Sequence, residues 1–108
     1  MGLRVGYASG RLLAIASGVK RGAIILALTA NAYYTLDGIR PGMPVVRISG
    51  RLHLGKPIHL GPNWWYTSVG HSATIVLKVR HHVIQEVGIA SRALTATRAE
   101  QARLLVNF

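Results

Sequence analysis

The stretch WWYTSVGHSATIVLKVRHHVIQEVGIAS, from Trp64 to Ser91, decides the fold of this chain. From Ala73 to Val79 every second residue is apolar and falls on one side of an extended chain, which is the period of a half-buried strand. An aromatic and β-branched run precedes it, and Gly70–Ser72 supplies a short turn, so the two runs predict a hairpin. Residues 83–89 resume the alternation after a break at His81–His82. The simplest fold for the stretch is therefore an antiparallel meander.

Helices are predicted in three places outside this stretch. Thr97 and Glu100 have the spacing of a capping box, in which each side chain satisfies a free backbone amide, so a helix should run from about Arg98 to Val106. Pro44 suits the first position of a second helix that reaches about Leu52. The mostly apolar residues from about 19 to 33 predict a third helix, which must be well covered.

The fold class that follows is α+β. We expect an antiparallel sheet of about four to five strands, one of them a short piece at Ile58–Leu60, with two or three helices packed on one face. The 108 residues are enough for one domain with a core. Half of the residues are apolar, so the composition excludes a disordered chain.

An internal repeat is suggested by a comparison of the two ends of the chain. When residues 3–34 are aligned in sequence with residues 77–108 without gaps, Ile15–Ala16–Ser17 aligns with Ile89–Ala90–Ser91. Repeats of this kind indicate duplication of a supersecondary unit. The alternative is a chance similarity between two amphipathic hairpins.

The N-terminal third of the chain has two interpretations. In the first, residues 1–35 are a hairpin–helix unit with strands at Leu3–Ala8 and Arg11–Ala16, and residues 36–108 hold a helix, the meander and the C-terminal helix. In the second, the chain begins with a secretory signal to about residue 32, since Ala30–Asn31–Ala32 has the small-x-small form of a cleavage site.

The charge of the chain is strongly basic. Lys and Arg number 13 against three acids, which gives a formal net charge of +10. This balance favours anionic partners such as nucleic acid, phospholipid headgroups or acidic polymers, although a GC-rich genome produces the same Arg bias. There is no cysteine for a disulfide or a thiolate metal site. The longest uncharged run, residues 22–36, is shorter than the roughly 20 residues of a transmembrane helix.

No catalytic, metal or cofactor site is predicted. The five histidines have no recognised ligand spacing, and His81 and His82 would point to opposite faces if they were extended. Of the three acids, Glu100 is assigned to the cap and Asp37 to a turn, which leaves only Glu86 as a general base. The sequence therefore indicates a protein that is not an enzyme.

Four short motifs resemble a known family. Gly38–Met43 followed by a short helix, Leu54–Pro57 at the helix exit, and Asn63–Tyr66 leading into a strand pair that ends at Val87–Ile89 look like the SmpA/OmlA-type module of outer-membrane assembly lipoproteins. That module is similar in fold to secreted β-lactamase inhibitor proteins. The resemblance implies a small α+β fold and a non-enzymatic binding role in the cell envelope or outside the cell, so this location is favoured over the cytoplasm.

A basic and aromatic surface is the candidate binding site. Trp64 and Tyr66 share one face of a strand while Trp65 takes the other, and the alternative is that all three aromatics fill the core. Arginine beside an exposed aromatic suits a protein interface or stacking on bases. We expect a non-catalytic binding or scaffold module that contacts a protein or envelope partner, with nucleic-acid binding as the alternative. The candidate surface comprises Arg40, Arg47, Arg51, Lys56, Trp64, Trp65 and Tyr66.

Overall fold

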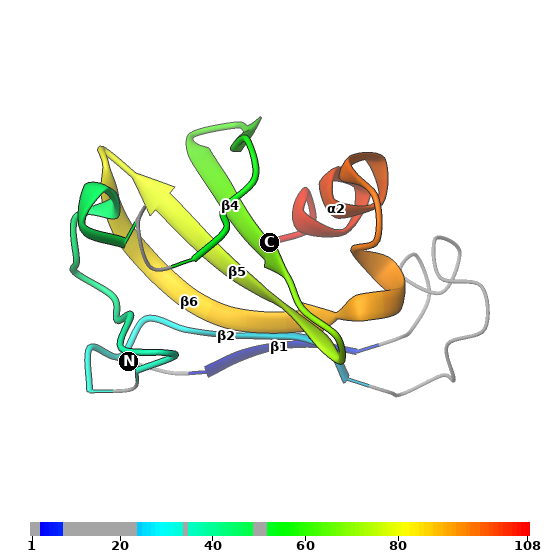
Figure 1. The fold of residues 1–108 in the computed structure, drawn as a ribbon, viewed down its shortest axis with the longest axis horizontal. Coiled ribbons are helices and arrows are strands. Elements are labelled where there is room, and N and C mark those ends of the chain that lie inside the picture. Colours follow the sequence, from blue (N-terminus) through cyan, green and yellow to red (C-terminus); the bar gives the residue numbers. More distant parts are fainter. Residues whose placement is uncertain (1–2, 8–23, 34, 49–51) are drawn as a thin grey trace.

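A six-stranded antiparallel sheet forms the body of the protein. The computed structural model describes residues 3–7, 24–33, 35–48 and 52–108. The strand order across the sheet is β1-β2-β6-β5-β4-β3, and every neighbouring pair is antiparallel. The strands are β1 (Leu3–Tyr7), β2 (Ile24–Thr29), β3 (Ile58–Leu60), β4 (Asn63–Val69), β5 (Ala73–Arg80) and β6 (Val83–Ser91). Figure 1 shows the sheet strongly twisted, with β1 and β2 running across the steeper β4.

The antiparallel meander predicted from the central stretch is confirmed. β4 pairs with β5 and β5 with β6, and the β4–β5 turn is closed by the Gly70 amide, which donates to the Ala73 carbonyl oxygen at 3.0 Å. The short extended piece at residues 58–60 is β3, paired with β4 at the edge of the sheet. The pairing of β5 with β6 has one irregularity. Lys78 pairs with Glu86, but the next residue, Val79, pairs with Ile84, so Gln85 has no partner on β5. Gln85 is therefore the extra residue of a β-bulge.

The predicted fold class, a sheet with two or three helices packed on one face, is wrong. The described residues contain a single α-helix, α2 (Arg98–Leu105), and two short 3-10 turns, η1 (Val45–Ile48) and η2 (Arg92–Leu94). The C-terminal helix is where the capping box predicts it, with the Glu100 amide bonded to Thr97 Oγ1 at 3.2 Å and the Thr97 amide to Glu100 Oε1 at 3.0 Å. The protein is mostly antiparallel sheet.

Residues 24–29 form a strand where a helix was predicted. β2 lies between β1 and β6, and Leu26 and Leu28 are fully buried on one side of it. Ile25 is buried as well and Ala27 is half-buried, and the sequence of β2 from Ile24 to Leu28 is a continuous apolar run. Such a run cannot be told from a buried helix by periodicity alone, and here the pairing with two strands decides the outcome.

The second predicted helix, from Pro44 to about Leu52, is reduced to the single turn η1. Its backbone bonds are taken by the β5–β6 hairpin: Val45 N–H donates to the His82 carbonyl oxygen at 2.9 Å, and Pro44 forms a β-bridge with Val83. Residues 49–51 lie outside the described part of the chain. Contact with the hairpin therefore overrides the local helix signal.

Two hydrophobic clusters cover the two faces of the sheet. The helix face is covered by α2 and η2, and its cluster comprises Ile25, Leu26, Leu28, Ile58, Trp65, Val76, Ala90, Leu94, Leu104 and Leu105. The loop face is covered by the segment between β2 and β3, and its cluster comprises Ile39, Met43, Ile48, Leu77, Val79, Ile84 and Val87. The helix thus covers one face of the sheet, and irregular chain covers the part of the other face formed by β5 and β6.

The predicted repeat and N-terminal strands are only partly within the described residues. β1 pairs with β2, whereas the predicted strand Arg11–Ala16 lies outside them. The repeat matches β1 with β5, but it also lays residues 24–29 over residues 98–103, which form the strand β2 in one copy and part of the helix α2 in the other. The described part of the first copy therefore gives the duplication no support. The repeat and the cleavage after Ala32 stay predictions.

Candidate functional site

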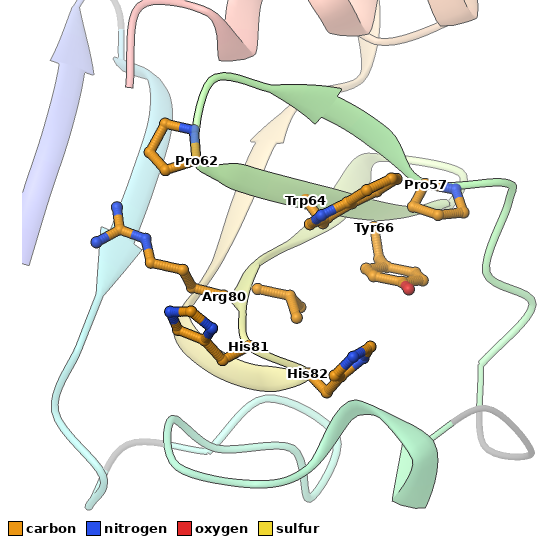
Figure 2. Close-up of a pocket in the computed structure, with 8 residues that line it drawn as sticks. Pro57, Pro62, Trp64, Tyr66, Arg80, His81 and His82 are labelled. Atoms are coloured by element: carbon orange, nitrogen blue, oxygen red, sulfur yellow. The ribbon is translucent and has the colours of Figure 1, made fainter.

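A pocket of about 520 Å³ opens at one end of the loop face. It lies where the β3–β4 turn approaches the β5–β6 turn, and Figure 2 shows Trp64 and Tyr66 above it with His81 and His82 below. Both walls belong to the meander, so the sheet fixes the distance between them. The pocket is lined by Pro57, Pro62, Trp64, Tyr66, Val79, Arg80, His81 and His82.

Trp64 supplies a flat aromatic wall. Its indole is 42% exposed although it is a large apolar group. The His59 ring, opposite it on β3, stacks on it with ring centroids 4.1 Å apart and planes 2° from parallel. Tyr66 lies on the same face of β4 two residues on and is half-buried. Because His59 covers one face of the indole, the ring is held in place and its other surface is left to the pocket.

Arg80 is held at the pocket by a fixed hydrogen-bond partner. Its Nε and Nη2 both donate to Asn63 Oδ1, at 3.0 Å and 2.8 Å, from the last residue of β5 to the first residue of β4. Asn63 is itself buried. Among the described residues no carboxylate forms an ion pair with Arg80. The guanidinium is therefore oriented by a neutral amide and keeps its full charge.

His81 and His82 form the two-residue turn between β5 and β6. Their φ angles are 54° and 65°, and positive φ at both positions defines a type I′ turn, which is best suited by Asn-Gly. Histidine tolerates this left-handed conformation better than most residues but less well than glycine. The His82 carbonyl oxygen accepts a hydrogen bond from the Val45 amide, so the segment between β2 and β3 holds the turn in place. Two imidazoles are thus carried into the pocket on a slightly strained but anchored turn.

The other wall of the pocket is fixed from the opposite side of the protein. Arg98, the first residue of α2, donates from Nη1 to the Lys56 carbonyl oxygen at 2.6 Å and from Nη2 to the Pro57 carbonyl oxygen at 2.7 Å. These bonds hold the chain that enters β3 where Pro57 lines the pocket. The helix start therefore positions part of the site without contacting it.

The structure places the residues of the predicted candidate surface in different parts of the protein. Trp64 and Tyr66 line the pocket, and Lys56 directly precedes Pro57 at its edge. Arg40 and Arg47 are exposed on the loop segment that contacts the β5–β6 turn. Arg51 lies outside the described residues.

Trp65 does not belong to that surface. It is 1% exposed and lies in the helix-face cluster, so its prediction as a surface residue is corrected by the alternation of β4 itself. Its indole N–H has no acceptor among the described residues. The polar pocket residues that sequence reasoning missed are Arg80, His81 and His82, together with Asn63, which orients Arg80 without lining the pocket. A pair of residues between two alternating runs is itself the signal of a hairpin turn, and it was available for the histidines.

The chemistry of a hydrolytic or metal site is not assembled at the pocket. Glu86 lies on the helix face, 3.4 Å from Lys78 Nζ, Glu100 is in the capping box, and Asp37 is in a turn at a φ of 53°. Across the described ranges no three His, Asp or Glu side chains gather as metal ligands would. The pocket is lined by an aromatic wall, one arginine and two imidazoles.

Comparisons with models of known families, with curated proteins and with solved structures find no match to this chain. The resemblance to the SmpA/OmlA-type module therefore stays a hypothesis. No helix in the part of the chain that the structure describes has the length and apolar character to cross a membrane.

Proposed function

We propose that this protein is a non-catalytic binding module that receives a flat group of a protein or envelope partner in the pocket between Trp64 and the His81–His82 turn. The observation that carries the proposal is the exposed Trp64 indole, backed by His59 and facing a pocket of about 520 Å³. Aromatic residues with arginine nearby are the groups that dominate the energy of protein interfaces.

A purely binding role is supported by the placement of the acids. None of Asp37, Glu86 and Glu100 lines the pocket, and no serine or threonine in the described part of the chain does so. A general base paired with a serine, threonine or cysteine nucleophile is the usual sign of covalent catalysis. Among the described lining residues the hydroxyl beside the histidines is the phenol of Tyr66.

The proposal is tested with a library of random peptides displayed on phage. We expect the wild-type protein to enrich a set of related sequences, and Trp64→Ala to weaken the binding of those peptides at least tenfold. Tyr33→Ala is the matched control, because Tyr33 is an exposed aromatic that does not line the pocket. Equal binding by wild type and Trp64→Ala, or no enrichment at all, would contradict the proposal.

Nucleic-acid binding is the second candidate, favoured by one further observation. Arg40 and Arg47 are exposed on the segment next to the pocket, and with the Trp64 ring they could serve a backbone and a stacked base. A thymidine oligonucleotide tests it by fluorescence anisotropy at increasing salt. Counterion release predicts a linear fall of log affinity with log salt, and an absence of binding at low salt excludes this function.

A further inference from the structure

We infer that the pocket selects an acidic segment of a protein partner, with a carboxylate bound by Arg80 and an adjacent flat side chain against Trp64. This inference rests on the proposed function and names the chemistry of its ligand. Arg80, Trp64 and the two histidines line the same pocket. Figure 2 shows the Arg80 guanidinium below Pro62, away from Trp64, so a ligand that contacts both groups must extend along the pocket.

The geometry of Arg80 carries the first step. A guanidinium has five N–H donors, and Asn63 Oδ1 takes one from Nε and one from Nη2. The donors that remain are on Nη1 and Nη2, and together they form the fork that binds both oxygens of a carboxylate. Asn63 therefore occupies the edge of the guanidinium formed by Nε and Nη2. This contact fixes the orientation of the opposite edge, formed by Nη1 and Nη2.

The charge around the pocket carries the second step. No carboxylate in the described residues pairs with Arg80, and the whole chain has a net charge of +10. A positive charge that is oriented yet uncompensated favours an anion from outside. His81 and His82 add imidazole groups on the opposite wall, in a turn where Asn-Gly would be the less strained choice. The two strained histidines lie at the edge of the pocket, where their side chains can contact a ligand.

The shape of the site favours a peptide over a nucleic-acid strand. Non-specific single-strand binding uses a groove with successive aromatic platforms for successive bases. Here one face of the single exposed indole is covered by His59, and Pro57 and Pro62 are drawn on either side of it in Figure 2. The pocket thus holds one ring and its neighbouring acid rather than a run of bases.

Short synthetic peptides test the inference directly. One series carries a single aromatic residue flanked by Asp and Glu, and its matched series has Asn and Gln in place of the acids. We expect wild type to bind the acidic series at least tenfold more tightly. Arg80→Gln should remove this preference, and Arg80→Lys should remove most of it, because an ammonium lacks the fork. Arg103→Gln, which changes the net charge equally on the exposed side of α2, is the control.

The variant Asn63→Ala tests whether the orientation of the Arg80 guanidinium, and not only its charge, contributes to binding. It leaves Arg80 charged but free to turn, and we expect several-fold weaker binding of the acidic series with little change for the amide series. Thermal unfolding of each variant identifies any loss of fold.

The outcomes divide the two proposals. If Trp64→Ala weakens binding but the acidic and amide series bind equally to wild type, the acidic ligand is excluded and the binding module stands. If neither series binds and display enriches nothing, both proposals fail. If a thymidine oligonucleotide displaces the peptides and binds more tightly than they do, the ligand is a nucleic acid and the inference is overturned.

Discussion

Removing one partner of the buried Lys78–Glu86 pair should destabilise the protein far more than removing both. The two residues face each other across β5 and β6 on the helix face, with Nζ and Oε1 3.4 Å apart and both side chains 11% exposed. Lys78 Nζ also donates to the Phe108 carbonyl oxygen at 3.2 Å and lies 5.7 Å from the centroid of the Trp65 ring. Glu86→Leu would remove the carboxylate that faces the ammonium on β6 and leave it with the Phe108 oxygen.

The magnitude follows from the separation of the two charges. At 3.4 Å and an effective dielectric constant near 20 their attraction is about 5 kcal/mol, and it is offset by a desolvation cost of several kcal/mol per ion. Loss of one partner from a buried pair costs about 3–5 kcal/mol, because the other charge stays buried. The double variant Lys78→Met/Glu86→Leu buries no charge, and we expect its free energy of unfolding within about 1 kcal/mol of wild type.

Urea unfolding of wild type, both single variants and the double variant completes the cycle. The expected coupling energy is about 3 kcal/mol or more. Arg103→Met on the exposed surface of α2 is the control and should change stability by no more than about 0.5 kcal/mol. A Glu86→Leu variant that loses less than about 1 kcal/mol, or single effects that simply add in the double variant, would refute the buried pair.

Three further predictions concern the sheet, the helix and the turn. Gly88→Ala should cost about 3 kcal/mol or more in urea unfolding, because the new methyl group would overlap the carbonyl oxygen of Ala27 on β2. Thr97→Ala removes the acceptor of the helix cap and should cost about 1 kcal/mol by the same measurement. The double variant His81→Asn/His82→Gly should raise the free energy of unfolding by about 1 kcal/mol, because it relieves two left-handed histidines, and should weaken peptide binding at least tenfold.

Each of these has a control or a contrary result. Gly55→Ala meets open space and should be nearly neutral, so equal effects at the two glycines would refute the close packing of β2 on β6. An unchanged stability of Thr97→Ala would show that the cap contributes nothing. A turn variant that binds peptides as wild type does would remove the histidines from the site.

The sequence predicts the meander well, because its signals are local. Alternation in residues 73–80 predicts a strand from its own residues, although the structure buries both faces of β5 and not one. The Thr97–Glu100 cap depends on four consecutive residues. The secondary structure of residues 24–29 cannot be predicted from local signals, because their apolar run suits a helix or a strand. Pairing with β1 and β6 selects the strand. The error in fold class is therefore an error about contacts distant in sequence.

The candidate site is predictable only in part for the same reason. Alternation places Trp64 and Tyr66 on one face, and this much needs no partner strand. The Arg80–Asn63 contact depends on the register of β4 against β5, which pairs Trp64 with Val79. The direction of the histidines depends on the turn type, which is set by both strands together.

The position of β6 in the middle of the sheet has a consequence for the order of folding. β5 reaches β6 through a two-residue turn, whereas β2 joins it from the other end of the sequence. Closing the longer loop costs more chain entropy and makes distant contacts form later. We expect amides at the β2–β6 junction to exchange with solvent faster than those between β5 and β6, and the opposite order would contradict this view. Every described residue that lines the pocket lies between Pro57 and His82, so opening the sheet at that junction would leave this part of the lining in place.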